Sequence, residues 1–251
     1  MKNITLLFAL LAIAVMSACR DHNHNDGPTT SFDITFQATF DGAQLEKNKD
    51  YQLGSIPFYV EAFRMYLSDI TLLKGSEEVR LSEIEYLDFT PSNATFATPK
   101  ITFNNVPEGE YTGIRIGYGV KPSLNAKRPA DFPAGHPLAV ENDYWAGWNS
   151  YIFTTLDGKA DPDNNGSKNL GLAYHSGSDA VYKTFDFVTP IHVHAGEAGA
   201  RITFDIKEYL TLPNGTFYDI AAHPATSNSA SDVTVAQVLS ANLGRATTVA
   251  Q

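Results

Sequence analysis

Alternation of apolar and polar residues is the feature that most constrains how this chain folds. In residues 32–40 (FDITFQATF) an apolar side chain occurs at every second position, which places one face of a strand in a core and the other in water. The same period or a continuous β-rich run recurs in residues 58–73, 84–89, 101–103, 111–118, 148–155, 181–188 and 201–206. Many short strands separated by Pro, Gly and Asn predict an all-β fold, an antiparallel β-sandwich.

One helix is expected near the C-terminal end. In residues 232–243 the apolar side chains share one helical face, Asp232 can cap the first turn, and Gly244 can end the helix. No internal repeat or long Pro/Ser-rich linker divides the chain, and its 251 residues are enough to bury one sizeable core. We therefore predict a single domain over residues 32–251, with long functional loops.

The first nineteen residues have the pattern of a bacterial export signal. Lys2 is followed by a twelve-residue apolar segment, which is too short to span a bilayer. Small residues then precede Cys19, as in a lipobox. We predict a lipoprotein signal peptide over residues 1–18, acylation of Cys19 and a flexible polar tether over residues 19–31. The protein would then lie in the periplasm or at the outer membrane, with the lipid as its membrane contact. An ordinary secretory signal is the alternative.

The composition excludes several classes of function. The net charge is −10, from 18 Lys and Arg against 28 Asp and Glu, so no basic surface is expected for nucleic acid. The single cysteine excludes an internal disulfide framework and multi-thiolate metal sites. The nucleophile elbow, HExxH, GxGxxG and P-loop motifs do not occur, so we expect a binding protein and no enzyme.

Histidines are the main candidates for metal ligands. His192 and His194 are two residues apart, so on a strand their imidazoles point to the same side, close enough to share one ion. His175 and His223 are further candidates. Neutral imidazole suits copper, and an acidic protein attracts cations. The alternatives are a solvated strand end for the pair and ordinary loop histidines for the other two.

Trp145 and Trp148 lie together between two segments that lack a clear strand pattern, residues 121–144 and 156–178. Loops of this length in compact domains are commonly functional. The two indoles are expected either to pack as an aromatic corner or to form a binding platform. A platform would suit a cell-surface module that binds a glycan or another protein, which is the second function consistent with the sequence.

Residues 161–166 (DPDNNG) match the start of a calcium-binding loop. Asp161, Asp163 and Asn165 provide oxygen atoms at positions one, three and five, and glycine follows at position six. The twelfth position is Leu172, where such loops require a bidentate Glu. The segment is therefore either a weak calcium site or a polar turn.

Several motifs occur in a fixed order along the mature chain. They are 63–72 (FRMYLSDITL), 106–114 (VPEGEYTGI), 117–120 (GYGV), 144–151 (YWAGWNSY) and 175–177 (HSG). This arrangement resembles the MbnP-like copper-binding family of extracytoplasmic β-sandwich proteins, which are often lipoproteins. The resemblance implies copper as cofactor, histidine together with an oxidised tryptophan (kynurenine) as ligands, and a di-haem peroxidase-like partner.

The resemblance carries over to particular residues of this chain. Trp145 and Trp148 match the family's aromatic segment, and His175 matches its His-x-Gly turn. With the downstream His192, His194 and His223, it implies a lipid-anchored protein for copper binding or acquisition. Side-chain distances separate the two functions. Imidazoles within about 5 Å of each other would favour a metal site, whereas a flat, exposed tryptophan surface remote from histidine would favour a glycan site.

Overall fold

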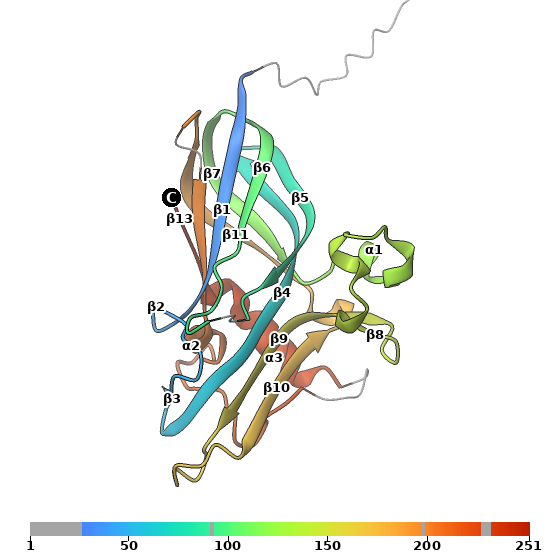
Figure 1. The fold of residues 1–251 in the computed structure, drawn as a ribbon. Helices are drawn as coiled ribbons and strands as arrows, with labels where there is room; N and C mark the ends of the chain where they lie inside the picture. Colours follow the sequence, from blue (N-terminus) through green and yellow to red (C-terminus); the bar gives the residue numbers. More distant parts are fainter. Residues whose placement is uncertain (1–26, 91–92, 197–198, 227–231) are drawn as a thin grey trace, which may run out of the picture.

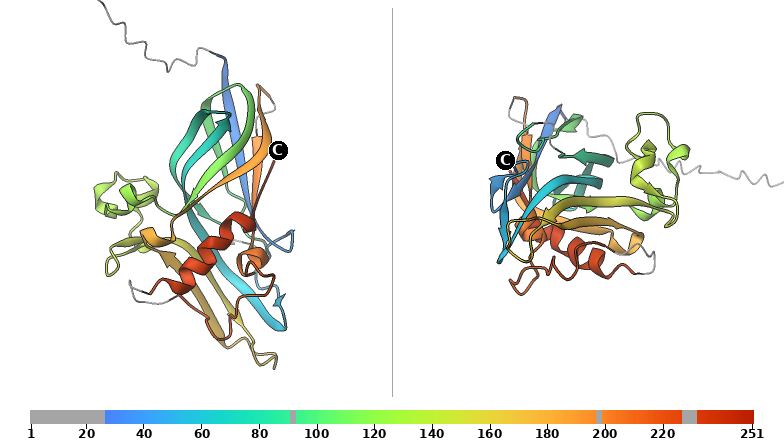
Figure 2. Two further views of the ribbon diagram at one scale, coloured as in Figure 1. Left: turned by 180° about the vertical axis from the view of Figure 1, so that it is seen from behind. Right: turned by 60° about the horizontal axis from the view of Figure 1, so that its bottom comes forward.

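The computed structural model describes residues 27–90, 93–196, 199–226 and 232–251. The predicted signal peptide, Cys19 and most of the predicted tether lie outside these residues. The described chain consists mainly of strands in two packed sheets, with a helix near the C-terminal end (Figures 1 and 2). The predicted all-β sandwich with one C-terminal helix is confirmed. In the part of the chain that is described, no helix is long and apolar enough to cross a membrane.

The smaller sheet has the order β13-β12-β1-β2, with β6 paired to β1. Its strands are β1 (Thr29–Phe40), β2 (Ala43–Gln44), β6 (Lys100–Pro107), β12 (Gly199–Asp205) and β13 (Thr247–Ala250). The alternation in β1 buries Phe32, Ile34 and Phe36, as its period predicts. The pair β1 and β12 is parallel, whereas the other pairs are antiparallel.

The larger sheet has the order β10-β9-β4-β7-β11. Its main strands are β4 (Ile56–Lys74), β7 (Gly109–Tyr118), β9 (Ser150–Ala160), β10 (Leu170–Gly177) and β11 (Lys183–Val193). Three more strands pair with this set: β3 (Tyr51–Leu53) and β5 (Glu77–Asp88) with β4, and β8 (Tyr144–Trp145) with β9. The long strand β4 pairs with β9 through its first half and with β7 through its second half, so β10 and β11 lie at distant places on one sheet.

Aromatic side chains between the sheets form the centre of the core. Phe204 of β12 is 1% exposed, and its ring lies 5.7–6.5 Å from the rings of Phe36, Phe63, Phe89 and Tyr118. The helix α3 (Thr234–Ala246) lies close to β10, β11 and β12 and buries Leu239 and Leu243 in the same core (Figure 2). A short helix, α2 (Ile206–Tyr209), follows β12 directly.

Residues 121–144 form the predicted non-strand segment. They contain α1 (Pro122–Asn125) and the short 3₁₀ turns η1 (Pro129–Asp131), η2 (Pro137–Ala139) and η3 (Glu141–Asp143). This segment covers a second hydrophobic cluster on the larger sheet. Two phenols of the sheet donate hydrogen bonds to its backbone: Tyr66 to the carbonyl of Pro137 at 3.2 Å and Tyr151 to that of Leu138 at 2.9 Å. Residues 121–144 are therefore attached to the larger sheet, next to Trp145 and Trp148.

Two predicted boundaries are wrong. The tether was predicted to extend through residue 31, but β1 begins at Thr29, where β-branched residues pair with β6. Residues 156–178 were predicted to lack strands, but β9 and β10 occupy both ends of this range. The first part of β9 lies within the predicted run 148–155. The rest of the hairpin contains Gly158, Gly171 and Gly177, and glycine is depleted in strands, so its β pattern is weak.

The predicted end of the C-terminal helix is also wrong. Asp232 accepts a hydrogen bond from the backbone of Thr234 at 3.3 Å, which agrees with a role at the start of the helix. The helix continues past Gly244 to Ala246. At Gly244 the ring of Phe185 lies so close that a Cβ atom would collide with it. The glycine therefore permits close packing of α3 on β11 instead of ending the helix.

Candidate functional site

Trp145 is the last residue of β8, and Trp148 lies in the tight turn that connects β8 to β9. Trp145 pairs with Ser150, and the backbone N–H of Trp148 donates to the carbonyl of Trp145 at 3.0 Å. The two indoles contact edge to face, with ring centroids 4.5 Å apart and an angle of 63° between the rings. Both side chains are partly buried. Of the two arrangements that the sequence left open, this geometry fits the packed aromatic corner, since the rings do not form one flat surface.

A buried carboxylate attaches this turn to the sheet. Asp143 directly precedes β8 and is 6% exposed. Its negative charge contributes to a raised pKa of Arg64 on β4 and of Tyr86 on β5. Burial, together with this carboxylate, raises the pKa of Tyr86, so the phenol stays protonated and hydrogen-bonded to Asp143. The buried charge therefore has a cation and a donor nearby, and the tryptophan turn has a fixed position on the sheet.

His175 is the predicted ligand that lies beside the tryptophans. It is on β10, and its ring centroid is 6.1 Å from that of Trp145. Its Nε2 lies 2.7 Å from Oδ1 of Asp157 on β9, a diagonal neighbour on the same face of the sheet. The two side chains are 30% and 28% exposed, so this pair is partly open to solvent.

The contact with Asp157 determines which nitrogen of His175 can bind a metal. Because Nε2 faces a carboxylate acceptor, it carries the proton in the neutral ring, which leaves the lone pair on Nδ1. The strand itself is fixed at this residue, since His175 exchanges two hydrogen bonds with the hydroxyl of Thr226, at 3.1 and 2.9 Å. A carboxylate that orients a metal-binding imidazole in this way is common in metalloproteins.

His192 and His194 form a second group, at the end of β11. As predicted from their spacing, they face the same side, and both approach one carboxylate. His194 Nε2 lies 2.7 Å from Oε1 of Glu110, and His192 Nδ1 contacts Oε2 of the same residue. Glu110 is the register partner of His192 on β7.

These two groups are far apart on the larger sheet. His175 lies in register, across β9, with Arg64 of β4. Glu110 lies three residues beyond Gly113, which pairs with Leu73 of β4. The distance along the strands is therefore about twelve residues, or about 40 Å. The four candidate histidines do not converge on one ion.

His223 does not join either group. Its segment runs beside β10, where Ala225 bridges to Ala173, and its exposed ring lies 6.1 Å from that of Tyr218. His223 is three residues before Thr226, the residue that contacts His175, which corresponds to about 10 Å along an extended chain. Among the described residues, no three His, Cys, Asp or Glu side chains already surround a metal position.

The predicted calcium loop is closed by its own hydrogen bonds. Asp161 is buried, and its carboxylate accepts hydrogen bonds from the backbone N–H groups of Asn165 at 3.1 Å and of Gly166 at 2.7 Å. Asp163 and Asn165 are exposed. These contacts are those of a polar turn, and they require no ion.

Removal of calcium is expected to leave the global stability unchanged, because the loop lacks its twelfth carboxylate and Asp161 is already hydrogen-bonded. The melting temperature with EGTA should match that with calcium to within about 2 °C, measured by scanning calorimetry. A shift beyond about 10 °C would demonstrate a strong structural ion.

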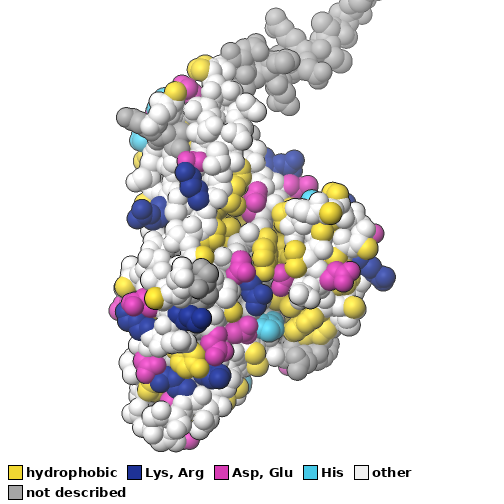
Figure 3. All heavy atoms as spheres, viewed as in Figure 1, with side chains coloured by type: hydrophobic (Ala, Val, Ile, Leu, Met, Phe, Trp, Pro, Cys, Tyr) yellow, Lys and Arg dark blue, Asp and Glu magenta, His cyan; other side chains and the backbone are white. Residues whose placement is uncertain are grey.

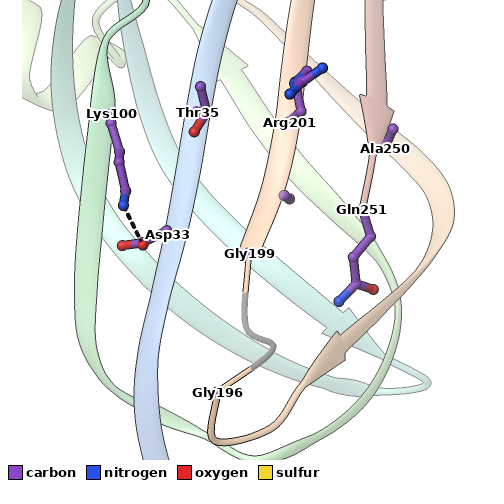
Figure 4. Close-up of a pocket in the computed structure, with 9 residues that line it drawn as sticks. Asp33, Thr35, Lys100, Gly196, Gly199, Arg201, Ala250 and Gln251 are labelled. Carbon is purple, nitrogen blue, oxygen red and sulfur yellow. Dashed lines mark ion pairs between the residues drawn. The ribbon is translucent and has the colours of Figure 1, made fainter.

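A shallow hollow of about 520 Å³ lies on the solvent side of the smaller sheet (Figure 4). At one side of it, Lys100 of β6 and Asp33 of β1 form an ion pair at 2.6 Å, and the described residues that line it include no histidine. On the face shown in Figure 3, Lys and Arg side chains are interspersed with Asp and Glu and form no continuous basic area. Neither feature competes with the two histidine groups as a metal site.

The sequence did not identify the carboxylates that accompany the histidines. Asp157 is 18 residues from His175 along the chain, and Glu110 is 82 residues from His192. For Asp157 a signal existed, since it is the one acidic residue of β9. For Glu110 the local sequence held no signal, because only the pairing of β7 with β11 brings it next to His192 and His194.

Comparison with known proteins gives the same fold. A structure titled "MbnP from Methylosinus trichosporium" is similar to this chain, with a TM-score of 0.52, 15% sequence identity, and coverage of 73% of this chain and 78% of that chain. A search of curated proteins found no match. The family model for MbnP matches residues 29–230, which is most of the chain. The tryptophan turn and the His175 strand both lie inside this range, and the chain belongs to the MbnP family.

Proposed function

We propose that this chain is an extracytoplasmic copper-binding protein, lipid-anchored at Cys19, whose metal site centres on His175. Membership of the MbnP family supports a copper-related role outside the cytoplasm. The observation that carries the proposal is the contact of the His175 imidazole with both Asp157 and the ring of Trp145. A binding role, and no catalysis, is the function proposed for this site.

The donor set explains why the tryptophans matter. His175 offers one imidazole nitrogen and Asp157 is engaged with that ring, so copper needs a further donor nearby. An unmodified indole is a poor metal ligand, whereas kynurenine carries a carbonyl oxygen and an aromatic amine. The ring centroid of Trp145 lies 6.1 Å from that of His175, so oxidation of Trp145 would add such a donor beside this imidazole. A di-haem peroxidase-like partner is the proposed source of that oxidation.

The glycan-binding alternative gains little from this geometry. Sugar rings stack on flat, exposed aromatic faces, but here the two indoles meet at 63° and both are partly buried. Trp145 is also next to a histidine instead of remote from one. Metal binding is therefore the function that the geometry supports better.

Metal analysis of the mature protein, purified from its native host, tests this function. We expect His175→Ala and Trp145→Phe each to lower the copper content per chain about tenfold or more, because each removes a donor or its precursor. His223→Ala is the matched control, since it removes an exposed imidazole from the segment beside β10. Its copper content should equal that of the parent. Retention of copper by His175→Ala would refute the assignment.

A further inference from the structure

The second histidine group has the composition of a metal site of its own. His192 and His194 present one ring nitrogen each to the two oxygens of Glu110. Glu108 is also near, with its Oε2 4.0 Å from His194 Nδ1. Two imidazoles and a carboxylate, with water in the fourth position, are a donor set that Zn²⁺ takes in proteins.

The backbone around this group is held in place. Val193, between the two histidines, is fully buried and lies in register with Gly109 of β7. The side chain of Gln251 makes two hydrogen bonds to the backbone of His192, at 2.7 Å each. Two imidazoles on a strand fixed at both sides lose little conformational freedom when they bind one ion.

The group is also accessible and negatively charged. The side chains of His192, His194 and Glu110 are 54%, 48% and 62% exposed, so an ion can reach them from solvent. Each imidazole faces one oxygen of the Glu110 carboxylate, so the two rings and the carboxylate are within reach of one ion.

We infer that His192, His194 and Glu110 form a second binding site, and that the ion it takes is Zn²⁺. Glu110 lies between the two rings, so the exposed carboxylate moves aside as the ion enters and then serves as the third ligand. Water completes the coordination. The site lies about 40 Å along the sheet from Trp145 and His175, so it binds independently of the copper site proposed there.

Calorimetric titration of the mature protein with Zn²⁺ tests this inference. The parent carries His175→Ala, which removes the tryptophan-side site, so failure of that proposal does not affect the result. We expect one Zn²⁺ per chain, with the dissociation constant raised about tenfold or more by His192→Gln, by His194→Gln and by Glu110→Gln. Glutamine retains a neutral polar side chain, and thermal melting checks that each variant is folded.

The tether histidines provide the control. His22→Ala/His24→Ala removes a pair with the same spacing from a segment predicted to be flexible, where chelation costs ordering entropy. This variant should keep the dissociation constant within about twofold of the parent. The inference would be overturned if the double variant His192→Gln/His194→Gln bound Zn²⁺ with the same dissociation constant as the parent. It would also be overturned if Zn²⁺ binding weakened only in the tether variant.

Discussion

Phe204→Ala is expected to lower the free energy of unfolding by about 3–5 kcal/mol. Phe204 is 1% exposed, and its ring contacts aromatic rings from both sheets, so truncation leaves a cavity at the centre of the sandwich. Chemical denaturation of the mature protein measures this loss as a lower midpoint at an unchanged slope.

Phe217→Ala is the matched control for the core variant. Phe217 is 38% exposed, and its removal should cost less than about 1 kcal/mol. Similar losses in the two variants would show that Phe204 is not at the centre of the core.

Cys19→Ala is expected to transfer the protein from the membrane fraction to the soluble fraction, or to stop its export, while the folded domain stays unchanged. The acyl chains predicted on Cys19 are the proposed membrane contact, and the substitution removes the thiol that would carry them. Cell fractionation and thermal melting of the released protein measure the two effects. His24→Ala, a tether variant with Cys19 intact, should remain with membranes. Unchanged fractionation of Cys19→Ala would refute acylation at this residue.

The strands could be predicted from sequence because burial on one side is a local property. In β1 the period of two identifies both the strand and its buried face. In β9 the buried first half was found as a continuous β-rich run, whereas the second half and β10 contain three glycines, which weaken the strand pattern there. The parallel pairing of β1 with β12 joins residues about 165 positions apart, such as Ala38 and Phe204, and no local pattern encodes such a partner.

In the candidate sites, too, local features could be predicted from sequence, whereas features that depend on strand pairing could not. The shared orientation of His192 and His194 follows from strand geometry and was predicted. Their common carboxylate, Glu110, depends on the register of β7 with β11, which the sequence does not reveal. His175 and Trp145 become neighbours only when two separate segments of the chain pack together. Their proximity was therefore implied by the family resemblance and could not be predicted from a local pattern. Separation of the histidines into distant groups became visible only from the order of the strands.

The position of copper in the protein from its native host tests the central claim most directly. Crystals of that protein, measured on both sides of the copper absorption edge, would locate the ion by anomalous difference density. The account predicts a peak about 2 Å from a ring nitrogen of His175, next to residue 145. A copper peak at His192 and His194 with none at His175, or copper bound elsewhere, would contradict it.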